Sequence, residues 1–238
     1  MRPPLPLHDL TLAAARDLTP HMRRLTFEMD GLLDYRAGQD LALLVPGADG
    51  EPQRRHYTIR EASPGEVVID FVIHGHHGPG ERWALDARPG DRLQARGPRG
   101  HTVINPDADW HVFVGDETCL PGIFAMLETL PRRARAFAFI EVEDKDDRQY
   151  LDADCDLDLE WLVRGGPAIP ASLPLIERMS LFAPPPGRGQ AYVIGETSTV
   201  RNIRRGLLAR GLDKGQVAAE GYWRPGRMGG HDHIFDEA

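Results

Sequence analysis

The sequence predicts two domains of different architecture, an antiparallel β-barrel or sandwich followed by an α/β domain with a parallel sheet. In the first part, Pro-Gly pairs at 46–47, 64–65 and 89–90 separate short runs of apolar residues, which is typical of antiparallel strands. After Asn105-Pro106, continuous apolar runs alternate with helical patterns, which favours parallel strands joined by helices. We therefore expect domains at 1–106 and 107–238.

The individual elements follow from the same patterns. In the first domain the expected strands are 9–16, 22–29, 40–46, 55–60, 66–73 and 91–96, with a short helix at 80–87. In the second domain the expected strands are 110–115, 134–142, 158–163, 190–195 and 216–222. Helices are expected where Leu120, Ile123, Phe124, Leu127 and Leu130 share a face, at 171–182, and at 200–210, where Gly211 ends the pattern.

Composition narrows the functional classes. The chain has 238 residues and a net charge of −8, which disfavours nucleic acid as a general partner. It has no run near the ~20 apolar residues of a membrane helix, and MRPPLPLHDL lacks a signal-peptide pattern. We expect a cytoplasmic, monomeric protein without membrane insertion. Two cysteines, Cys119 and Cys155, are too few for a disulfide framework or a zinc site.

The stretch RRHYTIR (54–60) has strand alternation but little to bury. Arg55 and Tyr57 share one face, while His56, Thr58 and Arg60 share the other. An arginine binds phosphate through two hydrogen bonds, and a tyrosine beside it can cover a flat heterocycle. Because Thr58 lies on the other face, it can contact the same ring only if the strand twists locally or if its backbone group makes the contact. The alternative is an exposed barrel strand whose charges face water.

A glycine-rich turn follows the next predicted strand, in DFVIHGHHGPGERWA (70–84). The turn leads into a helix, whose first amides and dipole favour an anion such as a diphosphate, and proline suits the first helical turn. His74, His76 and His77 lack a further ligand group at regular spacing and so do not predict a metal site.

Two segments of the second domain echo each other. VFVGDET (112–118) and YVIGETS (192–198) each run from a buried strand through Gly and an acid into a hydroxyl and a helix. Both turns are expected at the carboxyl edge of the sheet, where α/β folds bind ligands. The alternative is two ordinary turns with capping residues. Arg201, Arg204 and Arg205 follow the second turn and either bind a 2′-phosphate or form a solvated helix face.

Six ordered motifs together resemble the siderophore-interacting protein family, the flavin-dependent ferric-siderophore reductases. They are RHYTIR (55–60), DFVIHGHHGPGERWA (70–84), PGDRLQARGPRG (89–100), VGDETCLPGIFAMLETLP (114–131), VIGETSTVRNIRRGLL (193–208) and GYWRPG (221–226). The resemblance covers about residues 9–226. It implies an α+β, two-domain, ferredoxin-reductase-like fold, with a six-stranded antiparallel FAD-binding barrel and an NAD(P)H-binding α/β domain.

The resemblance also implies roles for residues. Arg55 would hold the FAD phosphate, Tyr57 would pack on the isoalloxazine and Thr58 would approach its reactive edge; Arg60 completes the motif. The other residues that the resemblance implies for cofactor binding are Asp70, Val72, His74, Gly75, Gly78, Pro79, Trp83, Ala84, Asp116, Glu117, Thr118, Glu196, Arg204 and Trp223. Of these, Thr118 is expected near the flavin or nicotinamide, in the reacting site with Tyr57 and Thr58. Trp83 has barrel packing as its alternative.

The implied activity passes electrons from NADPH or NADH through FAD to Fe(III) in a siderophore, releasing Fe(II). Many siderophores are anionic, so Arg36, Arg54, Arg224 and Arg227 are candidates for binding the substrate. The family's pattern has alanine where this chain has Cys119, which is read as a small replacement or, alternatively, a redox-active thiol. The C-terminal His-Asp-His (231–233) is expected to be a solvated tail. Rival functions are a general NAD(P)H:flavin or ferredoxin-type reductase and a non-catalytic flavin or siderophore binder.

Overall fold

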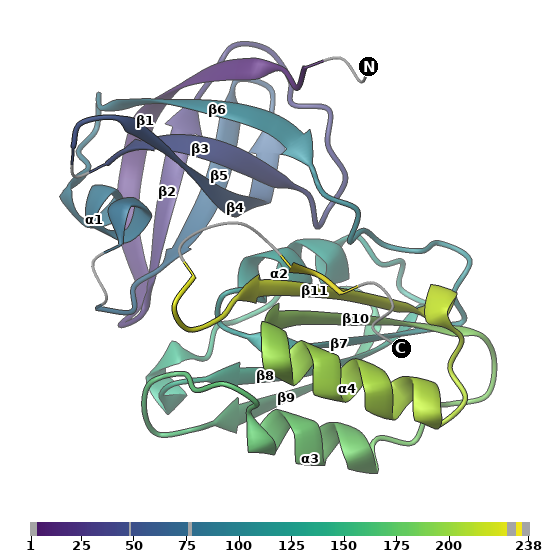
Figure 1. Ribbon diagram of the computed structural model, residues 1–238. Helices are drawn as coiled ribbons and strands as arrows, with labels where there is room; N and C mark the ends of the chain where they lie inside the picture. Colours follow the sequence, from purple (N-terminus) through teal and green to yellow (C-terminus); the bar gives the residue numbers. More distant parts are fainter. Residues whose placement is uncertain (1–3, 48, 76–77, 228–231, 235–238) are drawn as a thin grey trace. The chain divides into compact units, whose positions relative to one another are not determined.

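A computed structural model describes residues 4–47, 49–75, 78–227 and 232–234 (Figure 1). The chain divides into two compact units, 1–103 and 104–238. Each unit has its own buried apolar cluster.

The first unit is a closed antiparallel barrel. Its strands are β1 (Leu7–Thr19), β2 (Met22–Glu28), β3 (Asp40–Pro46), β4 (Pro52–Ser63), β5 (Glu66–Val72) and β6 (Arg92–Arg99). They follow one another around the barrel in the order β1-β2-β5-β4-β3-β6. Alternating residues such as Phe27, Leu41, Leu43 and Phe71 fill the interior. The helix α1 (Pro79–Asp86) adds Ala84 to this core. The predicted barrel is confirmed.

Strand β4 changes partner within the stretch RRHYTIR. It pairs with β3 from Pro52 through Thr58 and with β5 only from Ile59 onward. A register shift between Ile59 and Glu61 leaves Arg60 at a bulge, where a strand bends and twists more strongly. The first half of β4, up to Thr58, is therefore not paired with β5, although both strands belong to the same barrel.

The second unit is an α/β domain. Its strands are β7 (Trp110–Asp116), β8 (Arg135–Val142), β9 (Asp156–Val163), β10 (Gly189–Glu196), β11 (Val217–Trp223) and β12 (Asp232–His233). The sheet order is β12-β11-β10-β7-β8-β9, parallel throughout except for the β11–β12 pair. Two short 3₁₀ helices span Lys145–Asp147 and Lys214–Gln216. The predicted parallel sheet is confirmed.

Three α-helices cover this sheet. They are α2 (Leu120–Glu128), α3 (Leu173–Leu181) and α4 (Thr197–Ala209). Helices α3 and α4 share a cluster with Phe139 of β8 and run along one face (Figure 1). Phe124 of α2 meets Trp161 of β9, whose register partner Ile140 points away from the Phe139 face. Helix α2 therefore covers the opposite face. Among the described residues, no helix is both long and apolar enough to cross a bilayer.

The C-terminal His-Asp-His was expected to be a solvated tail, and for Asp232 this expectation is wrong. Asp232 and His233 form β12, which pairs antiparallel with β11. The Asp232 carboxylate accepts a hydrogen bond from the Thr197 hydroxyl (3.0 Å) and pairs with Arg224 and Arg227. Residue 231 lies outside the described residues. The charge pairs and the hydroxyl explain why this segment folds back onto the sheet.

Candidate functional site

Arg55 and Tyr57 lie on the inner face of β4, as the alternation predicts. Their register partners on β3 are the buried Leu43 and Leu41. The Arg55 guanidinium donates to the Arg54 carbonyl (2.8 Å) and to Gln53 Oε1 (2.8 Å). It is half-buried, and among the described residues its hydrogen-bond partners are a backbone carbonyl and a side-chain amide. A guanidinium binds an anionic ligand through charge-assisted hydrogen bonds.

The Tyr57 ring packs into the gap between β4 and α1. Its centroid is 4.1 Å from that of Phe71, and a Cβ added at Gly80 would fall 2.0 Å from the Tyr57 hydroxyl. Burial raises the pKa of Tyr57, the Arg55 guanidinium lowers it, and the nearby Glu81 carboxylate raises it; the net direction is upward. The phenol is therefore a neutral hydrogen-bonding group at physiological pH.

The other face of β4 carries His56 and Thr58. Their register partners are Ala42 and Asp40, and Thr58 is buried. Asp40 Oδ1 lies 3.3 Å from His56 Nδ1 and 3.4 Å from Arg99 Nε. Thr58 stands where β4 leaves β3, which is the kind of local irregularity that its predicted contact requires. Its approach to the flavin stays a prediction.

Asp70 on β5 has a partner within the barrel. Both of its oxygens accept from Arg24 on β2, at 2.6 and 2.7 Å, and Arg24 is its register partner. This buried pair ties β2 to β5, so a contact of Asp70 with a cofactor stays a prediction. Beyond it, Val72 is half-buried and His74 and Gly75 are exposed. His76 and His77 lie outside the described residues.

The start of α1 fits the predicted diphosphate cradle. Gly78 is the N-cap residue and provides no side-chain cap, and Pro79 follows at the first helical position. A Cβ at Gly78 would meet nothing within 4 Å, so there is open space beside the helix terminus. The first-turn amides and the helix dipole favour an anion in that space. The residues present therefore fit the diphosphate of a dinucleotide.

Trp83 of α1 packs on the barrel. Its ring stacks on Phe27 with centroids 5.9 Å apart and planes 16° apart, and the neighbouring Ala84 is fully buried. The packing alternative for Trp83 is thus supported. Since the ring is only half-buried, one part of it stays accessible, and its contact with a cofactor stays a prediction.

At the carboxyl edge of the second unit's sheet, Asp116 joins three strands. Its Oδ2 accepts from the Glu196 amide (3.0 Å) and from the Trp223 indole (2.9 Å), and its Oδ1 accepts from the amide and the hydroxyl of Thr118. Burial raises the pKa of Asp116 most, and the charge of Glu117 raises it further. The hydrogen bonds from Thr118 and Trp223 lower this pKa, but the net direction is upward. Asp116 therefore positions Trp223 and Thr118; direct contact with a nucleotide stays a prediction.

The glycines of the two echoing turns allow this close packing. A Cβ at Gly115 would fall 2.5 Å from the Ile194 carbonyl oxygen, and one at Gly195 would fall 2.7 Å from Asp116 Oδ2. Gly195 also has φ +130°, which favours glycine. Gly221 is similarly close to the Thr197 hydroxyl (2.4 Å). Close packing therefore explains why both turns have a glycine at the same position, independently of any ligand at the edge.

A buried ion-pair cluster lies beside Asp116, and its cation, Arg164, was not among the residues predicted from the sequence. Arg164, directly after β9, donates with two nitrogens to Glu117, and one of its nitrogens lies 3.6 Å from a Glu141 oxygen. Burial raises the pKa of Glu141, while the Ser172 hydroxyl and Arg164 lower it. The signal available in the sequence was an arginine ending one strand and acids ending its neighbours.

Glu196 serves as the cap of α4. Its side chain accepts from the amides of Ser198 (2.9 Å), Thr199 (2.8 Å) and Ala171 (2.9 Å). Burial alone would raise the pKa of Glu196, but these hydrogen bonds outweigh it and the pKa is lowered. The capping alternative for this turn is therefore supported, and a nucleotide contact of Glu196 stays a prediction.

The candidate arginines differ in exposure. On α4, Arg201 is half-buried, Arg204 is buried and Arg205 is exposed. The expectation of a solvated helix face is therefore wrong for Arg204, whose role toward a nucleotide stays a prediction. Arg36 and Arg54 are exposed in the first unit. Arg224 and Arg227 share Asp232 as counter-ion.

Cys119 is a buried N-cap residue of α2. Its thiol donates to the Asp116 carbonyl (2.9 Å), and burial, with the charges of Asp116 and Glu117, raises its pKa well above the usual range. A protonated, buried thiol is a poor nucleophile. We expect iodoacetamide at pH 8 to leave Cys119 unmodified in the folded protein and to modify it after unfolding in urea, measured by peptide mass spectrometry. Modification of the native protein at the rate of free cysteine would restore the redox alternative.

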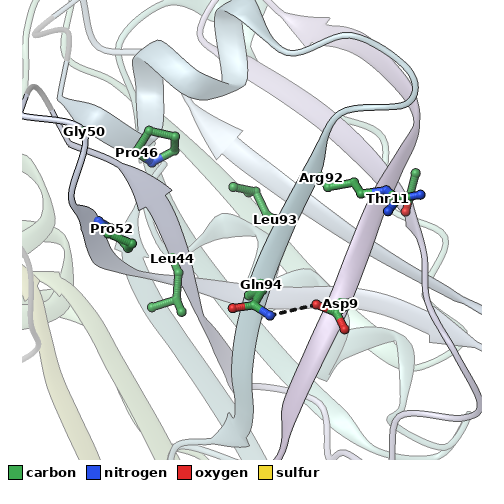
Figure 2. A pocket seen from close by; sticks show the side chains of 9 residues that line it. All are labelled: Asp9, Thr11, Leu44, Pro46, Gly50, Pro52, Arg92, Leu93 and Gln94. Carbon is green, nitrogen blue, oxygen red and sulfur yellow. Dashed lines mark hydrogen bonds between the residues drawn. The ribbon is translucent and has the colours of Figure 1, made fainter.

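A hollow of about 380 Å³ lies on the outside of the barrel, over β1, β3 and β6 (Figure 2). Leu44 lines it, and the register partner of Leu44 is Arg54, so this face is opposite to that of Arg55 and Tyr57. The hydrogen bond between Gln94 Nε2 and Asp9 Oδ1 (2.9 Å) crosses it. None of the predicted cofactor residues lines this hollow, and we assign it no role.

A closed antiparallel barrel with one helix, joined to a parallel five-stranded α/β domain, is the ferredoxin-reductase-like architecture. The chain belongs to the siderophore-interacting protein family within it. Residues 42–102 match the siderophore-interacting FAD-binding domain, and residues 108–226 match the siderophore-interacting protein model.

Individual relatives agree with this assignment. A siderophore utilization protein from T. fusca superposes with a TM-score of 0.87 at 35% identity, covering 98% of both chains. The ferric vibriobactin reductase ViuB of Vibrio cholerae is 36% identical over 74% of this chain and 66% of its own. The NADPH-dependent ferric-chelate reductase of Escherichia coli is 30% identical over 76% of this chain and 70% of its own.

Proposed function

We propose that this protein is an FAD-dependent ferric-siderophore reductase that passes electrons from NAD(P)H through bound FAD to Fe(III) in a siderophore, releasing Fe(II). The observation that carries the proposal is the contact of Tyr57 with the first turn of α1, with Arg55 on the same face of β4, within the matched FAD-binding domain. The names of the reductases of Vibrio cholerae and Escherichia coli support the reaction type.

In this proposal the barrel holds the cofactor. Arg55 supplies the positive charge for the phosphate, the α1 amides bind the diphosphate, and Tyr57 borders the ring system as a neutral phenol. FAD supplies the redox chemistry, because a flavin accepts two electrons from a nicotinamide and can pass them on singly to iron. The residues of the chain bind and orient; the reaction requires no nucleophile from the protein.

The α/β unit is proposed to bind the nicotinamide donor at the carboxyl edge of its sheet. Thr118 is half-buried there, held by two hydrogen bonds to Asp116, and Trp223 is held by a third. The iron remains in its chelate as substrate. Arg36, Arg54, Arg224 and Arg227 are the proposed groups that attract an anionic siderophore, since they are exposed cations.

An anaerobic titration tests this function. The purified protein, saturated with FAD, is expected to lose its flavin absorbance when NADPH or NADH is added, and to regain it when a ferric siderophore follows without air. A ferrous-specific chelator then reports the released Fe(II). Running both nucleotides and several siderophores identifies the donor and the substrate.

The same titration separates the rival functions. Reduction by nicotinamide followed by reoxidation with ferredoxin or free flavin, but not with any ferric siderophore, favours a general reductase. Bound flavin that neither nucleotide reduces favours a binding protein or another donor. A protein that stays colourless after incubation with FAD contradicts every flavin-based function.

A further inference from the structure

An acid occupies the first turn of α1, beside the proposed diphosphate cradle. Glu81 is the third residue of the helix and is only 7% exposed. Its Oε1 accepts a hydrogen bond of 2.6 Å from the amide of Gly75, which ends the strand side of the glycine-rich turn. The carboxylate therefore binds a backbone amide of the turn, as an oxygen of a bound phosphate does in cradles of this kind.

Glu81 also shares its surroundings with the other proposed phosphate-binding residues. The Tyr57 hydroxyl lies against Gly80, the residue before Glu81. Burial raises the pKa of Tyr57, while Arg55 lowers it and Glu81 raises it, so both charges lie close to the phenol. Glu81 lies in the first turn of α1, next to the residue that contacts Tyr57, so its negative charge lies where a diphosphate would bring more.

We propose that Glu81 is an internal anion that competes with the FAD diphosphate for this cradle and weakens FAD binding. In the FAD-free protein its carboxylate holds the Gly75 amide and compensates the helix dipole. When FAD binds, the two anions repel each other in a partly buried site, where charges interact more strongly than in water. This inference rests on the proposed function, because it requires FAD at this cradle.

A purely structural role for Glu81 predicts the opposite outcome. If the carboxylate only fastens the turn, its hydrogen bond to Gly75 preorganises the cradle, and any loss of that bond weakens FAD binding. Glu81→Gln separates the two roles, because the amide oxygen still accepts from the Gly75 amide while the charge is gone. Glu81→Ala removes both the charge and the bond.

The experiment measures FAD affinity of the flavin-stripped protein from the quenching of FAD fluorescence. We expect Glu81→Gln to bind FAD on the order of tenfold more tightly than the wild type, which corresponds to about 1.4 kcal/mol. Asp86→Asn is the matched control, because it removes one charge from the exposed end of the same helix. It should change the dissociation constant less than twofold. Riboflavin, which has no phosphate, should show no gain with Glu81→Gln.

The outcomes are distinct. Wild-type FAD binding with an unchanged or weaker affinity in a folded Glu81→Gln variant, checked by circular dichroism, overturns the inference and leaves the proposed function standing. An equal gain for riboflavin and FAD also overturns it, because the effect would not involve phosphate. Absence of FAD binding in the wild type and the variant overturns the inference and the proposed function together. A gain for FAD but not for riboflavin in Glu81→Gln supports the inference, and the difference between Glu81→Gln and Glu81→Ala then measures the effect of the lost hydrogen bond to Gly75.

Discussion

Replacing Arg55 by alanine is expected to yield a protein that purifies without its flavin. Arg55 is held on the inner face of β4 by the Arg54 carbonyl and Gln53, with its charge available to a phosphate. A hydrogen bond to a charged group contributes about 1.5–3 kcal/mol, so the dissociation constant for FAD should rise about 10- to 100-fold. The measurement is the ratio of flavin to protein absorbance, followed by titration of the stripped protein with FAD.

Arg54 gives this experiment its control. It precedes Arg55 in the same strand, is exposed and points to the opposite face. Arg54→Ala removes the same charge from the same strand, so it should keep its flavin content, although siderophore binding is a separate question for that residue. A yellow Arg55→Ala protein with the flavin content of the wild type would contradict the central assignment of the site.

Replacing Arg164 by methionine is expected to lower the free energy of unfolding by about 3–5 kcal/mol, as the removal of one partner from a buried ion pair does. The side chains of Arg164, Glu117 and Glu141 are 7%, 6% and 3% exposed, so neither carboxylate can turn to solvent in place of its lost partner. Urea unfolding followed by circular dichroism measures the loss.

The loss should depend on pH in a defined direction. Burial raises the pKa of Glu141, so the folded protein holds that proton more tightly than the unfolded chain. Stability therefore falls as pH rises between the ordinary glutamate value and the raised one. Because Arg164 lowers the pKa of Glu141, its removal raises that pKa further and extends to higher pH the range in which stability falls. The deficit of Arg164→Met should be larger at pH 8 than at pH 5.5.

An exposed ion pair of the same unit serves as the comparison. Arg178 on α3 pairs with Glu160 on β9 at 2.7 Å, and the two side chains are 31% and 46% exposed. Arg178→Met should cost about 1 kcal/mol or less. Equal losses for Arg164→Met and Arg178→Met, or a deficit for Arg164→Met that does not change with pH, would argue against a buried charge cluster.

Local patterns in the sequence were sufficient for the fold. The strand alternation of RRHYTIR and the continuous apolar run WHVFVG each determine which side chains are buried, and burial drives the two sheets. The inner-face placement of Arg55 and Tyr57 followed from the same two-residue period. The helix after the glycine-rich turn was also predicted, because its start at Gly78-Pro79 depends on adjacent residues only.

Those local patterns did not predict contacts between side chains that are far apart in the sequence. Arg164 meets Glu117 across 47 positions, and Asp116 reaches Trp223 across 107. Such contacts depend on which strands become neighbours, and a single sequence does not encode that in its periodicity. The burial of Arg204 and the return of Asp232 to the sheet belong to the same class. The contact of Glu81 with Gly75 is local, by contrast, but the sequence pattern does not show the effect of the Glu81 charge on an anion bound at the cradle.

The glycine packing at the ends of β7, β10 and β11 sets a limit on protein engineering. In the proposed function the turns that carry Gly115 and Gly195 border the nicotinamide donor, so they would be the first positions considered for changing the donor preference. Even a methyl group at either position collides with a backbone oxygen or a buried carboxylate. Mutant libraries are better directed to exposed Arg205, where side chains can be exchanged without rebuilding this edge.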